Sequence, residues 1–158
     1  MIPRIETSRE KKLVGKRLMM SISDYKVSEL WKSFMPKRKE ICNLVNDDLI
    51  SLSIYRSTYF TDFGSAEYFD KWAAVEVLNF DNVSEEMETF VLQSGLYPVF
   101  NYKGLNTDHS IFQYIFNAWL PSSNFVLDNR THFEILAGKY INSDPDSEEE
   151  ILIPIKKH

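Results

Sequence analysis

The stretch THFEILAG, residues 131–138, reads as a β-strand because aromatic and β-branched residues lead to a closing glycine. Side chains along a strand alternate between its two faces. Phe133 and Ile135 therefore share one face, whereas His132 and Glu134 share the other. A carboxylate in the middle of so apolar a strand indicates either that this face is exposed to water or that Glu134 is a buried functional acid.

The segments around this strand repeat the order strand–helix–strand–strand twice along the chain. In the first half we predict a helix within residues 23–41 and strands at residues 11–21, 48–56 and 71–80. In the second half we predict a helix over residues 107–121 and strands at residues 90–104, 131–138 and 150–156. Residues 122–130 and the acidic residues 139–149 are predicted to be loops.

The repeated order predicts an α+β fold built from a duplicated strand–helix–strand–strand module. We expect antiparallel sheet halves with two main helices packed on one side and a ligand groove at the pseudo-twofold seam. One domain should span residues 1–158, with repeat halves at about 11–80 and 88–157. The long strand over residues 90–104 should bend or bulge at Gly95 or Pro98.

Helical spacing of apolar residues predicts the buried face of each helix. In the first helix these residues are Val27, Leu30, Trp31 and Phe34, and Ser28 is a candidate N-cap. In the second helix they are Ile111, Ile115, Ala118 and Trp119, with Thr107 or Asp108 as the candidate cap.

Composition limits the classes of partner. Hydrophobic residues make up 44% of the 158 residues, enough for a packed core, and aromatic residues make up 14%, enough to wall a pocket with rings. The net charge of −5 argues against a broad phosphate-binding surface, so we expect no direct nucleic-acid binding.

Cys42 is the single cysteine, and three scattered histidines give no metal-site pattern, so we expect neither metal nor cofactor. Without an apolar leader or membrane-length segment, we expect a cytoplasmic protein that does not bind membranes.

Five short motifs follow one another in the chain. They are LVG at 13–15, GLYPVFNYKG at 95–104, WLP at 119–121, FE at 133–134, and acidic residues followed by IPI at 148–155. Their order and spacing resemble the GyrI-like family of bacterial proteins, also called AraC-type effector-binding domains, over residues 12–156. One residue departs from the family pattern, because Pro98 stands where many members carry a small residue other than proline.

The resemblance implies a stand-alone domain that binds hydrophobic, often aromatic and cationic, molecules between its two halves. Such domains serve multidrug binding and transcription regulation. The acid of the family's FE strand corresponds to Glu134. Aromatic rings around a buried carboxylate would attract a cationic ligand further through cation–π interactions. The candidate walls are Tyr55, Tyr59, Phe60, Tyr68, Trp72, Phe100, Tyr102 and Trp119. His132 shares the face of Glu134, and Glu76 is a candidate second acid if it also faces the seam.

Three functions remain open from the sequence. The first is a module that sequesters or senses a hydrophobic, cationic aromatic ligand through Glu134. The second is a hydrolase of a strained or electrophilic molecule, with Glu134 as general base and Tyr102 or Tyr68 orienting the substrate. The third is an inhibitor of a topoisomerase-like partner, with residues 143–150 mimicking a phosphate backbone. A homodimer or another protein partner is compatible with each of them.

Overall fold

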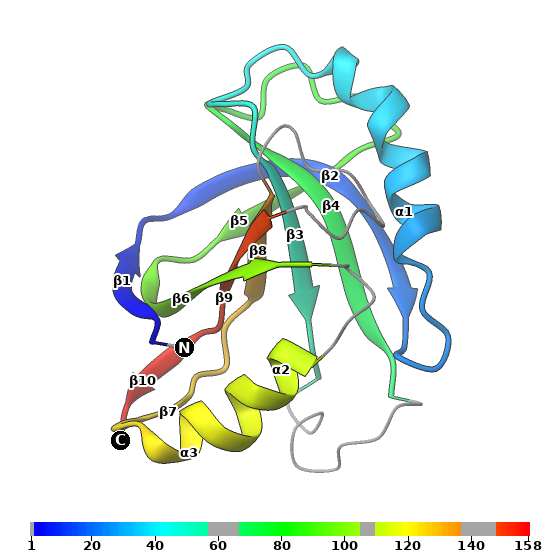
Figure 1. Ribbon diagram of the computed structural model, residues 1–158. Helices are drawn as coiled ribbons and strands as arrows, with labels where there is room; N and C mark the ends of the chain where they lie inside the picture. Colours follow the sequence, from blue (N-terminus) through cyan, green and yellow to red (C-terminus); the bar gives the residue numbers. More distant parts are fainter. Residues whose placement is uncertain (1, 57–66, 105–109, 137–147) are drawn as a thin grey trace.

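A curled antiparallel sheet dominates the computed structural model, which describes residues 2–56, 67–104, 110–136 and 148–158 (Figure 1). Its eight strands lie in the order β1-β6-β9-β8-β3-β4-β2-β5, and a separate pair joins β7 to β10. The strands are β1 (Arg4–Ser8), β2 (Lys11–Met20), β3 (Leu49–Ile54), β4 (Phe69–Val77), β5 (Glu88–Leu92), β6 (Gly95–Lys103), β7 (Phe125–Leu127), β8 (His132–Leu136), β9 (Glu148–Leu152) and β10 (Ile155–Lys157). Together with two helical segments, these strands confirm the predicted α+β class.

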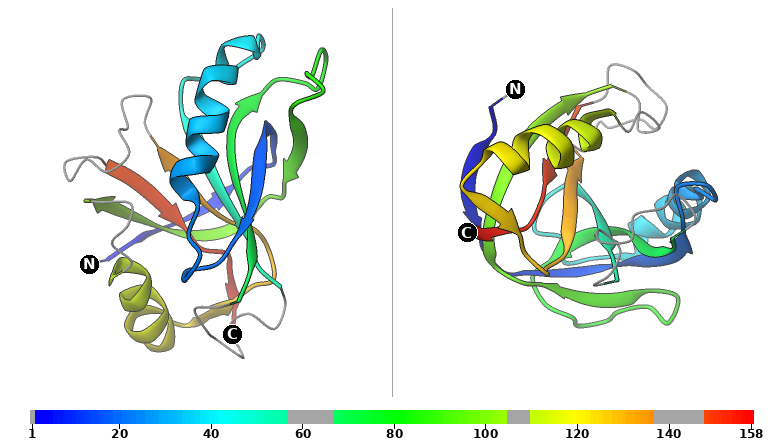
Figure 2. Two further views of the ribbon diagram at one scale, coloured as in Figure 1. Left: turned by 90° about the vertical axis from the view of Figure 1, so that its right-hand side faces the viewer. Right: turned by 90° about the horizontal axis from the view of Figure 1, so that it is seen from below.

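Two long bent strands bring the sheet edges together. Ser8 of β1 lies opposite Gly95 of β6, and Lys11 of β2 lies opposite Leu92 of β5. The register is therefore continuous across the bend, so β1 and β2 act as one strand and β5 and β6 as its partner. The predicted bend at Gly95 is present, and Pro98 lies inside β6 opposite Ile5. Because edge strands β1 and β5 belong to this ribbon, the sheet curls into a partial barrel (Figure 2).

The inner face of the curl is apolar. One cluster of buried residues draws on seven strands, from β2 to β9, and includes Leu52, Trp72, Tyr97 and Phe133. Side chains from so many strands can meet only on the concave side. Gly15 in β2 allows close contact with β4, because a Cβ atom there would lie 2.2 Å from the carbonyl oxygen of Ala73.

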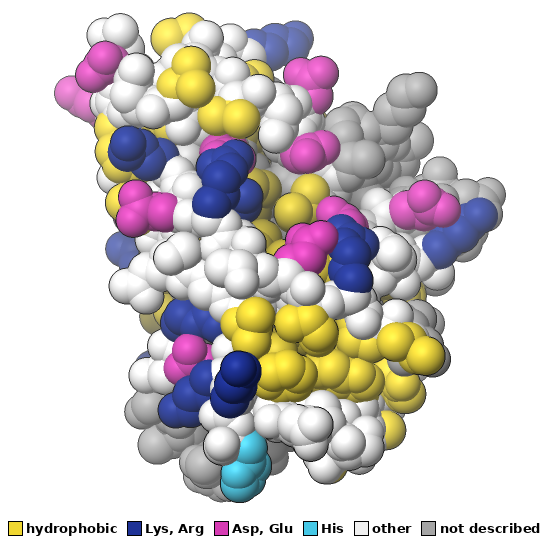
Figure 3. All heavy atoms as spheres, turned by 90° about the vertical axis from the view of Figure 1, so that its left-hand side faces the viewer, with side chains coloured by type: hydrophobic (Ala, Val, Ile, Leu, Met, Phe, Trp, Pro, Cys, Tyr) yellow, Lys and Arg dark blue, Asp and Glu magenta, His cyan; other side chains and the backbone are white. Residues whose placement is uncertain are grey.

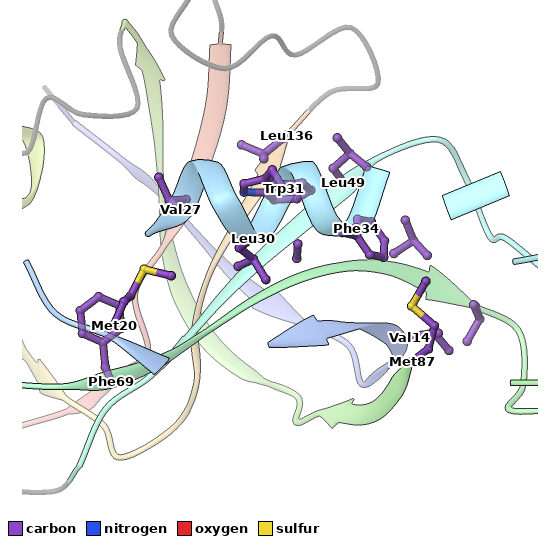
Figure 4. Packing of buried hydrophobic residues seen from close by; sticks show 13 residues of the cluster. Val14, Met20, Val27, Leu30, Trp31, Phe34, Leu49, Phe69, Met87 and Leu136 are labelled. Atoms are coloured by element: carbon purple, nitrogen blue, oxygen red, sulfur yellow. The ribbon is translucent and has the colours of Figure 1, made fainter. Parts of the chain in front are cut away.

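The outer face carries two clusters, each beneath one helical segment. Helix α1 (Val27–Phe34) continues into the 3₁₀ turn η1 (Met35–Glu40). Figure 4 shows Leu30 and Phe34 of α1 packed toward the sheet, and the predicted stripe of four residues is buried. The helix begins at Val27, with Lys26 at the N-cap position, so Ser28 lies within the first turn and is not the cap.

The second helical segment comprises α2 (Ser110–Tyr114), the π-helical turn η2 (Ile115–Trp119) and α3 (Leu120–Ser122). Ile111 and Ile115 are buried beneath it, Trp119 is partly buried, and Ala118 is exposed, contrary to the predicted stripe. The wider π turn rotates later residues around the axis, which breaks the spacing of a regular helix. The candidate caps Thr107 and Asp108 lie outside the described residues.

Three short strands differ from the sequence prediction. β1 was not predicted, and β7 occupies the expected loop at 122–130. The predicted last strand is two strands, because Pro154 separates β9 from β10. β7 has three residues and pairs only with β10, so its formation depends on a partner far away in the sequence. The acidic loop at 139–149 lies mostly outside the described residues, and its last two residues begin β9.

The centre of the sheet is symmetric in its order. Strands β6, β9 and β8 lie on one side of the middle, and β3, β4 and β2 lie on the other, so β3 and β8 form the seam. This is the arrangement that two halves at about 11–80 and 88–157 would produce; their duplication remains a prediction.

The face that carries β1 has mixed charge. Basic and acidic side chains interleave over this ribbon, and apolar side chains gather below them (Figure 3). Arg4 pairs with Glu6 at 2.6 Å and also with Glu150 of β9. Neither sign of charge dominates this face.

Candidate functional site

Polar side chains gather on the outer face of the seam between β3 and β8. Ser53 of β3 lies opposite His132 of β8 and opposite Lys71 of β4, and Ser51 lies opposite Glu134. The two helices cover the sheet on either side of this strip, which leaves the polar residues between two apolar clusters. We call Ser53, Lys71, His132, Glu134 and Glu149 the seam cluster.

Lys71 supplies a buried positive charge to the seam cluster. Only 5% of the residue is exposed. Its Nζ donates a hydrogen bond to Ser53 Oγ at 2.9 Å and lies 3.5 Å from Glu134 Oε1. Burial by itself would lower the pKa of Lys71, but attraction to Glu134, together with smaller attractions from Tyr25, Tyr55 and Glu149, outweighs it, and the pKa is raised. Lys71 is therefore an ammonium ion at neutral pH and not a nucleophile.

Glu149 adds a second carboxyl group. It lies on β9 opposite Leu136 and opposite Tyr102, and 8% of the residue is exposed. Burial, followed by the charge of Glu134 and a hydrogen bond with it, raises the pKa of Glu149 to about 9. At neutral pH the cluster thus holds one ammonium group and one protonated carboxyl group beside Glu134.

His132 is held neutral among rings. The ring of Tyr55 lies edge-on to it with centroids 4.9 Å apart, and the ring of Phe116 lies at 6.2 Å. Burial, and then repulsion from Lys71, lowers the pKa of His132 to about 3. The neutral imidazole of His132 therefore packs between aromatic rings as part of the buried interior.

Lowering the pH should destabilise the folded protein through the buried His132. The folded pKa of about 3 is below the unfolded value near 6.5, so stability is lost as the pH falls below 6.5. Between pH 7 and 5.5 the free energy of unfolding should fall by about 1 kcal/mol more in the wild type than in His132→Phe. Urea unfolding at both pH values measures this. The exposed terminal variant His158→Phe should keep the wild-type slope; equal slopes for His132→Phe and the wild type would contradict the assignment.

An open hollow of about 530 Å³ lies at one end of β6, β8 and β9. We call it the acidic hollow; its lining includes Asp48, Tyr102, Lys103, Ile135, Glu148 and Glu149. With Glu150, four acidic residues and one lysine line it within the described ranges. Glu149 alternates with Glu148 and Glu150 along β9, so its side chain lies on the outer face with the seam cluster, whereas theirs lie on the inner face. Glu134 does not line the hollow. An acid-lined concavity of this kind raises the local concentration of cations.

The structure brings together part of the predicted site. Glu134 and His132 share the outer face, as the alternation predicted, and Tyr55 lies beside them. Tyr102 lies across from Glu149 on the wall of the hollow. Phe100 and Trp119 contact each other, with ring centroids 5.3 Å apart, in the cluster beneath the second helical segment.

Other predicted residues lie elsewhere. Trp72 packs inside the curl, on the opposite face of the sheet from Glu134, because its neighbour Lys71 takes the outer face. Tyr68 is exposed and donates to Asp24 at 3.3 Å. Glu76 also faces inward, opposite Leu13, and pairs with Arg9 at 2.6 Å, so it is not the second acid. Tyr59 and Phe60 lie outside the described residues.

Sequence reasoning missed Lys71 and Glu149. Lys71 begins a hydrophobic strand and Glu149 ends an acidic run, so each resembles a solvated flank. The alternating Ser51 and Ser53 in an otherwise apolar strand were the available sign of a polar strip. Only the strand pairing shows that these positions meet Glu134.

The curled antiparallel sheet with two helical segments on its outer face defines the class of α+β domain. Residues 1–156 match the GyrI-like small molecule binding domain, and the chain belongs to this family. A comparison with curated protein sequences finds no significant match.

Solved structures share the fold at low sequence identity. SAV2435 bound to tetraphenylphosphonium has a TM-score of 0.73 at 14% identity, covering 99% of this chain and 94% of that one. The EcmrR C-terminal domain has a TM-score of 0.74 at 15% identity, covering 98% and 97%. In an EcmrR–DNA complex, the match covers 57% of the EcmrR chain. A hydrolase from Listeria innocua has a TM-score of 0.59 at 9% identity, covering 98% and 92%.

In the part of the chain that the structure describes, each helix is too short or too polar to cross a bilayer.

Proposed function

We propose that this protein binds hydrophobic cationic small molecules at the seam cluster. The observation that carries the proposal is the excess of carboxyl groups there, because two acids meet one lysine. Lys71 lies 3.5 Å from Glu134 and balances one negative charge. Glu149, on the same face of the neighbouring strand, is left without a second ammonium in the cluster.

A cation would stabilise this arrangement. Burying an ionised carboxylate costs several kcal/mol unless an opposite charge compensates it. Tyr102 lies opposite Glu149, and its ring favours a cation by about 0.5–2 kcal/mol. The bound state of SAV2435 supports this choice of ligand, because the molecule in that structure is the lipophilic cation tetraphenylphosphonium.

Calorimetric titration with tetraphenylphosphonium at pH 8.5 tests the proposal. The wild type should bind it, and Glu134→Gln should weaken binding at least about tenfold, because Glu149 would then be needed to balance Lys71. Glu85→Gln removes the same charge from an exposed position before β5 and should leave the affinity within about twofold. Lack of binding by the wild type from pH 6.5 to 9, or equal affinity in Glu134→Gln, would contradict the proposal.

Two other functions expected from the sequence remain predictions. A hydrolase would need Glu134 to activate a water molecule, whereas its neighbours in the seam cluster are Lys71 and Glu149. Phosphate mimicry by residues 143–150 depends on a segment that lies mostly outside the described residues. Cation binding is the function that the described side chains favour.

A further inference from the structure

We propose that β1 is an association edge for a second copy of this chain, and that the two β1 strands pair antiparallel about Ile5. This inference does not depend on ligand binding, so it and the proposed function can fail separately. β1 (Arg4–Ser8) begins the order of the eight-stranded sheet, and in the described part of the chain β6 is the only strand that pairs with it. The other side of β1 is therefore an open sheet edge, which is a template for a further strand.

The register of β1 on β6 shows which backbone groups this edge presents. Ile5 lies opposite Pro98, and Thr7 lies opposite Leu96. In an antiparallel pair, residues that exchange hydrogen bonds alternate with residues whose N–H and C=O groups point away from the partner strand. Pro98 has no N–H to exchange, and the carbonyl oxygen of Leu96 accepts a hydrogen bond from Arg130. The N–H and C=O groups of Ile5 and Thr7 therefore point outward, to the open edge.

The side chains of β1 are complementary to an antiparallel copy of the same strand. When two copies pair about Ile5, each Ile5 lies opposite the other, and Arg4 of each copy lies opposite Glu6 of its partner. Opposite charges and apolar pairs directly across two strands are stabilising, whereas like charges are destabilising. Ile5 is 42% exposed, and the side chains of Arg4 and Glu6 are 46% and 47% exposed, so all three can be reached by a partner.

The devices that usually protect an edge strand are absent from β1. Such strands commonly carry lysine, proline or a bulge, but β1 reads RIETS, and its register with β6 is unbroken from Arg4 to Ser8. The opposite edge strand, β5, lacks the same symmetry, because Glu88 is its single charged residue. Pairing between strands of five residues makes a small interface compared with the about 1,200 Å² of stable complexes. We therefore expect a reversible dimer that dissociates on dilution.

Sedimentation velocity of the full chain at increasing concentration tests the association. The sedimentation coefficient of the wild type should rise from the monomer value toward the dimer value as the concentration reaches about 500 µM. Ile5→Pro removes the outward N–H of β1 and keeps the hydrogen bonds to β6, so this variant should retain its circular dichroism spectrum and stay monomeric. A wild type that is still monomeric at about 500 µM would overturn the proposal.

Exchanging the charges of β1 tests the register of the pairing. Arg4→Glu and Glu6→Arg should each weaken self-association at least about tenfold, because like charges then lie opposite each other. An equal mixture of the two variants should associate as the wild type does, since one variant has only acids and the other only bases at positions 4 and 6. Self-association of the single variants at wild-type strength, or no association in the mixture, would overturn the proposed pairing.

Disulfide trapping locates the contact directly. In a Cys42→Ser background, which removes the single native thiol, Ile5→Cys should form a covalent dimer under mild oxidation. Opposed residues that exchange hydrogen bonds have Cα atoms about 5.5 Å apart, which is within the range of a disulfide. Val91→Cys is the matched control, because Val91 is 45% exposed on the edge strand β5, and it should cross-link at least about tenfold more slowly. Equal rates for the two positions would contradict the assignment to β1.

Discussion

Replacing Lys71 by methionine should lower the free energy of unfolding by about 3–5 kcal/mol at pH 7.5. Methionine keeps the apolar stem of the side chain and removes the ammonium group. The seam cluster would then hold the charge of Glu134 without its partner at 3.5 Å, and Ser53 would lose the donor at 2.9 Å. An uncompensated charge at a buried site costs far more than the pair contributes when it is intact.

Urea unfolding followed by circular dichroism measures this loss, and two further variants identify its cause. Lys103→Met removes an exposed strand lysine and should change stability by less than about 0.5 kcal/mol. The double variant Lys71→Met/Glu134→Gln should recover more than half of the loss, because neither charge then remains unpaired. A double variant less stable than Lys71→Met would show that packing, not charge, accounts for the effect.

Raising the pH should destabilise the unliganded protein through Glu149. Its folded pKa of about 9 is above its ordinary value of 4.5, so the folded state binds a proton that the unfolded chain releases. The contribution is fully present below pH 4.5 and is lost as the pH rises through 9. At about 1.4 kcal/mol per unit of pH, the loss between pH 6.5 and 9 should be about 3 kcal/mol.

The difference between wild type and Glu149→Gln isolates this contribution, because every other titrating group is common to both. Glutamine is neutral, as Glu149 is in the folded state at neutral pH, so the variant should fold and should lack this part of the pH dependence. Urea unfolding at pH 6.5, 7.5 and 9 gives the two slopes. Parallel slopes for the two proteins would mean that Glu149 is ionised in the folded state.

Local patterns predicted the local part of the fold. The helical spacing from Val27 to Phe34 predicted the buried face of α1, because that face depends on the period of the helix alone. The same rule was wrong at Ala118, where a π turn interrupts the period. β1 and β7 escaped prediction because each is short and pairs with a partner distant in the sequence.

The sequence by itself determined which face of its strand Glu134 occupies, since alternation along a strand requires no partner. It also determined the family, because the order of the short motifs can be read without knowing which residues contact one another. The tertiary structure alone decided what Glu134 meets. Strand pairing across the seam brings Lys71 within 3.5 Å of Glu134 although the two residues are 63 positions apart. The pairing of β8 with β9 likewise places Glu149, and not Glu76, beside Glu134, and so makes one buried acid part of a charge-balanced cluster.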